Sequence, residues 1–396
     1  MVKVSVENLY KIFGNHPERA FKLLEKGAAK DEVMAKTGCT VGLADVSFAV
    51  EEGEILVVMG LSGSGKSTLI RCVNRLIEPT RGRVKVDDVE VTGLAQDELL
   101  ELRRRKFGMV FQHFALFPHR TVVENVEFGL EIQGRDPEVR REKALESLQL
   151  VGLEGWGDSL PGQLSGGMQQ RVGLARALCA NPDVLLMDEA FSALDPLIRR
   201  DMQHELIALQ ASMQKTILFI THDLDEALKL GSRIILMKDG MIVQEGTAED
   251  ILTRPANGYV EKFVEDVDLS RVLTAGSVMV RARVVAFPTD GPRTMLHKMH
   301  EEGISSIFVV NKDYTYRGMV TADQASQAIK NGQKTMDGLV NTEITPVLES
   351  EPVSNLFAIL AEHARPIPVV NEQDKLKGVV VRGSLLAGLA EGGASS

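Results

Sequence analysis

Residues 54–77 read EILVVMGLSGSGKSTLIRCVNRLI. The apolar run at 54–59 has strand length, and residues 66–77 have the composition of a helix. The glycine-rich loop between them, GLSGSGKST at residues 60–68, matches the phosphate-cradling pattern GxxxxGK(S/T). Because this loop joins a buried strand to a helix N-terminus, the run predicts a nucleotide-phosphate site (a P-loop) rather than a turn that happens to contain lysine.

The chemistry of the P-loop follows from its residue types. Its glycines let successive backbone N–H groups turn toward a β-phosphate, and the helix N-terminus adds partial positive charge. We expect Lys66 to reach the β- and γ-phosphates and Ser67 to offer its hydroxyl to Mg²⁺. The predicted phosphate-binding residues are Gly60, Ser62, Gly63, Ser64, Gly65, Lys66, Ser67 and Thr68.

Two later apolar runs predict the rest of the sheet. Residues 183–187 form one buried strand and residues 216–220 another. The sequence between the strands at 54–59 and 183–187 is predicted to be largely helical. It includes a helix at residues 136–151, with Asp136 as the expected N-cap. This order predicts an α/β domain whose mainly parallel sheet is interrupted by a helical insertion.

Ionisable side chains follow these strands. Asp188 closes the 183–187 strand, where it can organise a metal, and Glu189 is the candidate general base that orients and polarises the attacking water. His222 comes just after the next strand and is a candidate donor to the γ-phosphate. An Asp-Glu pair alone fits a plain strand end, but behind a P-loop it indicates the second half of a nucleotide-hydrolysing site.

A second anion-binding turn is predicted about a hundred residues after the P-loop. Residues 164–170 read LSGGMQQ, so Ser165, Gly166 and Gly167 stand immediately before a helix. The alternative without a binding role is a flexible glycine turn with a helix cap.

Together these motifs resemble, in order and spacing, the full set of ABC-transporter ATPases. The set comprises the P-loop, Gln112 after the strand at 108–111, LSGGM, Asp188-Glu189, SALD at 192–195 and His222. The resemblance covers about residues 1–255 and implies a P-loop NTPase fold of the ABC type with a helical subdomain. It also implies a head-to-tail homodimer, in which the P-loop of one subunit and the LSGG of the other enclose each ATP.

The same resemblance assigns roles to individual residues. Gln112 joins the catalytic residues Glu189 and His222, because it resembles the residue that ligates Mg²⁺ and senses the transmembrane partner. Asp195 resembles the aspartate at the dimer seam. Phe13 resembles the aromatic residue that stacks on adenine, with Tyr10 as the alternative. The implied metal ligands are Ser67, Gln112 and Asp188.

Longer stretches narrow the resemblance. A helical excursion is expected at residues 14–40, where a typical importer ATPase has only a few residues. This insertion, with NRLIEPTRG at 74–82, QHFALFP at 112–118 and MDEAFSALDPLIR at 187–199, is similar to the ATP-binding subunits of glycine betaine/L-proline importers. That family implies a separate transmembrane permease, a substrate-binding protein and a peripheral position on the cytoplasmic face of the plasma membrane.

The C-terminal part contains an internal repeat. IFVVNKDYTYRGMV at 307–320 aligns without a gap on IPVVNEQDKLKGVV at 367–380, an offset of 60 residues. Each copy predicts a hairpin-like strand pair flanked by helices, and the two copies are expected to cover each other's sheets. The pair resembles tandem cystathionine-β-synthase-type (CBS) domains of the α+β class, which that importer family carries after its ATPase.

The expected domain boundaries follow from these readings. The ATPase domain is expected at 1–265, with its helical subdomain at about 113–178. A linker at 266–276 leads to CBS domains at 277–333 and 334–390 and a tail at 391–396.

The CBS copies depart from the nucleotide-binding pattern of that family, which has glycine, two apolar residues, a hydroxyl residue, two further residues and aspartate. The first copy reads GMVTAD from Gly318 and is one residue short, and the second reads GVVVRGS from Gly378 with neither group in place. A nucleotide ligand for the pair is therefore disfavoured. His297 and His300 are read as exposed helix-face residues rather than metal ligands.

Composition limits the remaining possibilities. The 396 residues include 45 Lys and Arg against 55 Asp and Glu, a net charge of −10 that argues against nucleic acid as a partner. No apolar run approaches the roughly 20 residues that cross a bilayer, and no secretion signal is visible. Cys39, Cys72 and Cys179 are expected to be buried hydrophobes in a reducing cytoplasm.

Three alternatives remain. The ATPase could serve another small solute, because cargo is chosen by other subunits. It could work without transport, in DNA repair or translation, although the acidic balance, the single ATPase domain and the lack of a long coiled-coil insertion argue against this. The CBS pair could be the main function with the ATPase as a passenger, which the presence of Glu189 disfavours.

Overall fold

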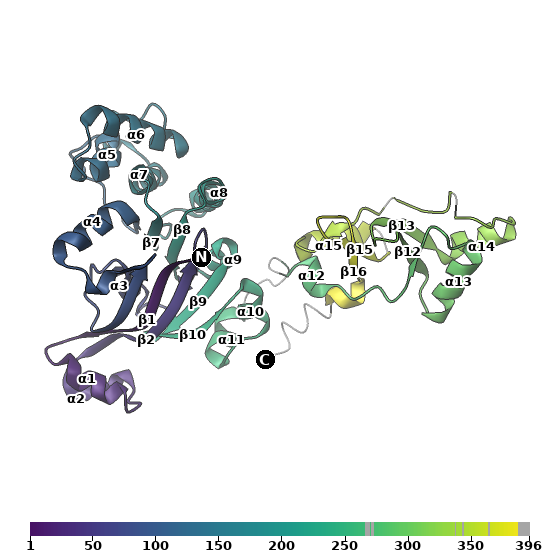
Figure 1. The fold of residues 1–396 in the computed structure, drawn as a ribbon, viewed down its shortest axis with the longest axis horizontal. Helices are drawn as coiled ribbons and strands as arrows, with labels where there is room; N and C mark the ends of the chain where they lie inside the picture. Colours follow the sequence, from purple (N-terminus) through teal and green to yellow (C-terminus); the bar gives the residue numbers. More distant parts are fainter. Residues whose placement is uncertain (266–269, 271–272, 337, 343, 363–364, 387–396) are drawn as a thin grey trace. The chain divides into compact units, whose positions relative to one another are not determined.

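A computed structural model describes residues 1–265, 270, 273–336, 338–342, 344–362 and 365–386 (Figure 1). The chain divides into two compact units, Met1–Val264 and Glu265–Ser396. The tail expected at 391–396 and residues 266–269 and 271–272 of the expected linker lie outside the described residues.

A six-stranded sheet is the centre of the first unit. Its order is β10-β9-β3-β8-β7-β6, and all neighbouring strands are parallel except β10 and β9. The strands are β3 (Ile55–Met59), β6 (Phe107–Phe111), β7 (Val184–Asp188), β8 (Thr216–Thr221), β9 (Arg233–Lys238) and β10 (Met241–Gly246). The three strands at its centre, β3, β7 and β8, are buried along their whole length, as continuous apolar runs predict for a parallel sheet covered on both faces.

A second, antiparallel sheet has the order β2-β1-β4-β5. Its strands are β1 (Val2–Phe13), β2 (Thr40–Glu51), β4 (Arg81–Val86) and β5 (Val89–Glu90). The excursion between β1 and β2 is helical, as expected, and consists of α1 (Pro17–Leu24) and α2 (Lys30–Thr37). Phe21, Val33 and Cys39 close a small core beneath these helices.

Nine further α-helices complete the first unit, which is described throughout. They are α3 (Lys66–Val73), α4 (Gln96–Lys106), α5 (Val122–Ile132), α6 (Pro137–Leu150), α7 (Gly166–Cys179), α8 (Pro196–Met213), α9 (Leu224–Leu230), α10 (Ala248–Thr253) and α11 (Gly258–Val264). Helix α3 ends earlier than the expected residue 77, because the chain turns at Arg75 with φ at +56°.

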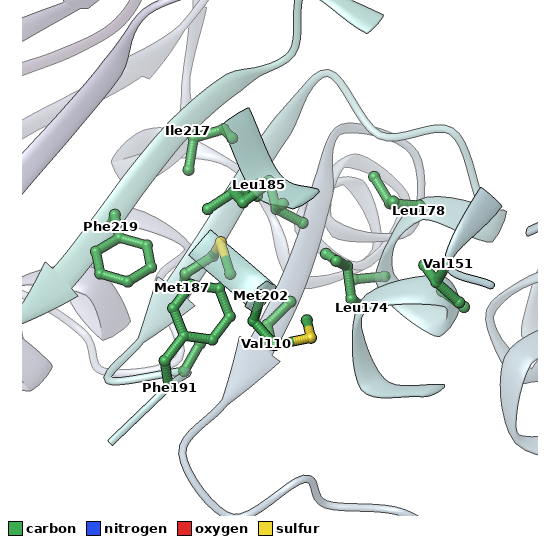
Figure 2. Packing of buried hydrophobic residues seen from close by; sticks show 14 of the residues in the cluster. Val110, Val151, Leu174, Leu178, Leu185, Met187, Phe191, Met202, Ile217 and Phe219 are labelled. Atoms are coloured by element: carbon green, nitrogen blue, oxygen red, sulfur yellow. The ribbon is translucent and has the colours of Figure 1, made fainter. Parts of the chain in front are cut away.

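Helices α5, α6 and α7 pack on one another within the first unit (Figure 1). Asp136 is the N-cap of α6, as predicted, and its carboxylate accepts from the backbone N–H of Glu138 at 2.9 Å. One continuous core joins these helices to the sheet: Val151, Leu174 and Leu178 pack into the same cluster as Leu185 and Phe219 of the strands (Figure 2). The helical insertion is thus anchored on the sheet that carries the site.

The second unit contains two similar halves. Their sheets have the orders β11-β12-β13 and β14-β15-β16, and in each the last two strands form the expected antiparallel pair. The strands are β11 (Val285–Ala286), β12 (Ser306–Val310), β13 (Tyr316–Thr321), β14 (Val347–Leu348), β15 (Ile367–Val370) and β16 (Leu376–Val380). The helices are α12 (Ala275–Val278), α13 (Pro292–Glu301), α14 (Ala322–Lys330) and α15 (Val353–Glu362).

The two halves share a core. Phe308 and Met319 of one copy lie in the same buried cluster as Leu376 and Val379 of the other. The helix α12 packs with the second copy, and Leu273 and Ala275, which the sequence assigns to the linker, are buried there. Leu273 and Ala275 therefore contribute to the second copy's core.

All three cysteines are free and buried, as expected. Burial raises the pKa of Cys72 to about 12 and that of Cys179 to about 11, so both thiols stay protonated and unreactive near neutral pH. Among the described residues, no helix combines the length and apolarity that a bilayer crossing needs.

Candidate nucleotide site

The carboxyl ends of three adjacent parallel strands meet at one end of the sheet. Strands β3 and β8 end opposite each other, with Met59 beside Thr221, and β7 on the far side of β8 ends at Asp188. Glu189 and His222 follow their strands directly. The fold therefore brings the P-loop and these three side chains to the end of the sheet where open α/β folds bind ligands.

Glycine is required in the P-loop by geometry. Gly60, Gly63 and Gly65 all have positive φ, at +148°, +81° and +101°. A Cβ on Gly60 would collide with the carbonyl oxygen of Met237, and one on Gly65 with that of Gly42. The chain reverses in a space that admits only backbone, which leaves its N–H groups open to a ligand.

Lys66, in the first turn of α3, lies inside the loop. It is only 4% exposed, and its Nζ donates to the carbonyl oxygens of Gly60 at 2.7 Å and Leu61 at 3.1 Å. Burial lowers its pKa, against the opposing charges of Glu189 and Asp188. The ammonium is thus desolvated and held by weak neutral acceptors, which favours its transfer to a phosphate oxygen.

Ser67, the residue after Lys66, places its hydroxyl against the carboxylate of Asp188. The Ser67 hydroxyl donates to Asp188 Oδ1 at 2.9 Å, and Arg71 lies 3.5 Å from Asp188 Oδ2. A hydroxyl and a buried carboxylate are donors that suit Mg²⁺. Gln112 is exposed and follows Phe111, which pairs with Asp188 in the sheet.

Glu189 and His222, the predicted base and γ-phosphate donor, contact each other. His222 Nδ1 lies 3.1 Å from Glu189 Oε2. Glu189 has the left-handed backbone conformation, φ +48°, and its N–H donates to the Ile220 carbonyl at 3.0 Å. Such a conformation is costly for a residue other than glycine and persists only where neighbours impose it, which is common at active sites.

The LSGG residues begin α7. Ser165 is the N-cap and accepts from the backbone N–H of Met168 at 3.3 Å, and both Ser165 and Gly166 are exposed. Gly167 is buried, and a Cβ there would sit 2.5 Å from Ile198 of α8. The close contact ties the LSGG turn to the start of α8, where Asp195 is the N-cap and accepts from the N–H groups of residues 197 and 198 at 3.2 and 3.1 Å.

The two adenine-stacking candidates differ in their surroundings. Phe13 is 40% exposed, with Lys11 Nζ 4.9 Å from its ring centre. Its ring and the Thr68 side chain both border Gly42, so Phe13 lies beside the start of α3. Tyr10 instead packs edge-on against Phe21 of the excursion at 4.9 Å. Phe13 is thus the more exposed of the two candidate rings and the one beside the P-loop helix.

Two arginines at this site were not expected from the sequence. Arg71 contacts Asp188, and Arg199 contacts Asp223. A signal was available in their spacing, because Arg71 lies four residues after Ser67 and Arg199 four after Asp195, one helical turn in each case.

Thr321, the hydroxyl residue of the pattern in the first CBS copy, caps a helix. Thr321 is the N-cap of α14: its Oγ1 accepts from the backbone N–H of Gln324 at 3.3 Å and donates to that side chain's Oε1 at 3.0 Å. In the second copy the Ser384 hydroxyl accepts from the backbone N–H of Val381 at 3.1 Å and donates to its carbonyl oxygen at 3.0 Å. His297 and His300 are exposed, and His297 pairs with Glu301 at 3.3 Å.

Family models match both units. The ABC transporter model matches residues 43–192, and the CBS domain model matches residues 275–331 and 337–391. Among solved structures, the dimeric, post-hydrolysis ATP-binding cassette MJ0796 bound to ADP and phosphate is 36% identical, with a TM-score of 0.53 over 62% of this chain and 98% of that one.

Two relatives align with this chain over nearly its whole length. The glycine betaine transport ATP-binding protein OpuAA of Bacillus subtilis is 55% identical over 98% of this chain and 93% of its own length. The glycine betaine/proline betaine transport system ATP-binding protein ProV of Escherichia coli is 48% identical over 100% of this chain and 99% of its own. The chain therefore belongs to the glycine betaine transport ATP-binding proteins, ABC-transporter ATPases that carry a tandem CBS pair.

Proposed function

We propose that this chain hydrolyses ATP in a head-to-tail dimer and thereby drives the import of glycine betaine or a proline-type osmolyte. The observation that carries the proposal is the meeting of the P-loop, Asp188, Glu189 and His222 at one end of the sheet, in a chain whose full-length relatives are named for glycine betaine transport.

Each residue has a distinct task in this proposal. The P-loop N–H groups and Lys66 hold the β- and γ-phosphates, and Phe13 stacks on the adenine. Glu189 accepts a proton from the attacking water, while His222, 3.1 Å from that carboxylate, orients it and donates to the γ-phosphate. The exposed Ser165 and Gly166 of the partner chain close over the same nucleotide.

Mg²⁺ is the metal that suits this donor set. Ser67 and Asp188 would hold it, with Gln112 from the neighbouring strand end as the third protein ligand. When bound, it neutralises charge that develops on the phosphate oxygens.

Transport requires further subunits. A transmembrane permease would supply the pathway and a substrate-binding protein the cargo, with the ATPase bound peripherally at the cytoplasmic face of the membrane. Because these subunits select the cargo, import of a different small solute is the second candidate.

Two measurements test the proposal: co-purification of this chain with a multi-span membrane protein, and stimulation of the chain's ATPase activity by betaine-loaded binding protein. Failure to co-purify with any membrane protein would favour a role outside transport.

The trans arrangement predicts complementation between two inactive variants. Ser165→Arg should still bind ATP but not form the nucleotide-enclosed dimer, because a bulky cation replaces the LSGG hydroxyl. Mixed with Lys66→Ala protein, it should regain nucleotide-dependent dimer, since one of the two sites then combines an intact Lys66 with an intact Ser165. Size-exclusion chromatography measures the effect. A mixture with no more dimer than either variant alone is the contrary result.

The CBS pair is proposed to regulate the ATPase rather than to take part in its chemistry. Every element needed for hydrolysis lies before about residue 255, and exposed charges such as Lys312, Asp313, Glu372 and Lys375 lie on the hairpin turns of the pair. Docking of these turns on a charged surface would weaken as the Debye length falls from about 10 Å at 0.1 M salt to about 3 Å at 1 M.

Truncation after Glu265 should therefore leave basal ATP hydrolysis intact in the isolated subunit. In the assembled transporter, we expect uptake to depend on internal salt with the full-length chain and to lose that dependence with the truncated one. Uptake measured across a salt series tests this, and superimposable curves for the truncated and full-length transporters would remove the regulatory role.

A further inference from the structure

An arginine outside the known motifs joins two loops at the nucleotide site. Arg199 lies in the first turn of α8. Its NH1 lies 3.2 Å from Asp223 Oδ2, and its NH2 donates to the carbonyl oxygens of Ser192 at 3.3 Å and Leu194 at 3.2 Å. One guanidinium therefore spans the SALD segment at 192–195 and the loop after β8.

The SALD segment and the loop after β8 both contact Glu189. On one side, the backbone N–H and hydroxyl of Ser192 donate to the Glu189 carbonyl oxygen at 3.1 and 2.9 Å. On the other, His222 lies 3.1 Å from the Glu189 carboxylate. Asp223 adjoins His222, so the contacts form a closed ring through Glu189, Ser192, Arg199, Asp223 and His222.

Asp223 is itself fixed on two sides. Its Oδ2 meets Arg199, while its Oδ1 accepts from the backbone N–H of Glu226 at 3.2 Å as the N-cap of α9. A rotation of this carboxylate would break both contacts, so the position of the His222 loop depends on both α8 and α9.

The ring matters because Glu189 has a left-handed backbone, φ +48°. A conformation of this kind is maintained only when the surroundings over-determine it. Arginine suits the task better than lysine: its planar fork serves acceptors in several directions at once, whereas a lysine ammonium is a single point charge. The Nε of Arg199 is buried without a hydrogen-bond partner in the described part of the chain, so the contacts of its two terminal nitrogens are what the site uses.

We propose that Arg199 is a positioning residue for ATP hydrolysis, which couples the SALD segment at the dimer seam to the loop that carries His222. This inference rests on the proposed ATPase function and names a residue that acts through Glu189 and His222 rather than on the nucleotide. A change at the dimer seam then moves the catalytic pair as one unit.

The test compares full-length Arg199→Ala with Arg200→Ala, a matched control in which the neighbouring arginine is exposed. For Arg199→Ala we expect kcat to fall about tenfold to a hundredfold, because a small displacement of the water-activating pair is costly to rate. The Kd for ATP should change little, since the P-loop is untouched. Arg200→Ala should match the wild type. A wild-type kcat in Arg199→Ala, or an equal loss in both variants, overturns the proposal.

A double-mutant cycle adds a second, independent criterion. Asp223→Asn keeps the helix cap but removes the charge that faces Arg199, so its kcat should fall in the same range. The double variant Arg199→Ala/Asp223→Asn should be no slower than about twofold below the worse single variant, because both act through one contact. Losses that multiply would contradict the ring.

Two further outcomes are distinguishable. If Arg199→Ala does not fold, Asp223→Asn carries the test alone, and a wild-type kcat in that variant overturns the proposal. If the wild-type chain itself does not hydrolyse ATP, the proposed function fails, which is a different result from a fast Arg199→Ala variant.

Discussion

Glu189→Gln should retain ATP and lose at least about a hundredfold in turnover, the range in which general-base catalysis contributes. The amide keeps the shape of the side chain and can still bond to His222, 3.1 Å away, but it cannot accept the proton of the attacking water. Hydrolysis stops with the nucleotide bound, so the variant should accumulate as an ATP-stabilised dimer on size exclusion.

The matched control is Asp225→Asn, which neutralises an exposed carboxylate in the first turn of α9. This variant should turn over like the wild type and stay monomeric to the same extent. Wild-type turnover in Glu189→Gln would instead refute Glu189 as the base.

Lys66→Ala should weaken ATP binding about a hundredfold, because hydrogen bonds to charged groups contribute roughly 1.5–3 kcal/mol each and about 1.4 kcal/mol corresponds to a factor of ten. The loss has a specific cause in this fold. Lys66 is buried within the loop and lies against neutral carbonyl oxygens, so its bonds to phosphate replace weaker ones.

Direct titration with ATP measures this effect, and Lys143→Ala serves as the control. Lys143 lies on α6 and pairs with Glu146 at 2.6 Å on an exposed surface, so its removal should leave the affinity unchanged. Near-normal affinity in Lys66→Ala would contradict the P-loop assignment.

The elements that carry the chemistry could be predicted because each is encoded locally. A continuous apolar strand followed by GLSGSGKST defines the P-loop without any tertiary information, and Asp136 followed by proline defines a helix start. The helical excursion after Phe13 was predicted for the same reason, and α1 and α2 occupy it.

The missed features depend on contacts between distant segments. Arg199 meets Asp223 because α8 contacts α9, the helix that Asp223 caps; the spacing within α8 could mark Arg199 but not name this distant partner. Leu273 and Ala275 are read as linker in the sequence because their apolar partner, Val353, is about 80 residues away. The inward position of Lys66 likewise depends on how the loop turns, which residue types alone do not specify.

Uptake of radiolabelled glycine betaine tests the central claim most directly. The chain would be assembled with its permease in vesicles, with ATP supplied on the face that carries the ATPase and binding protein on the other. The account predicts uptake that requires ATP and is abolished by Glu189→Gln. An assembled complex that hydrolyses ATP but takes up no betaine, or that takes it up equally well with Glu189→Gln, would contradict it.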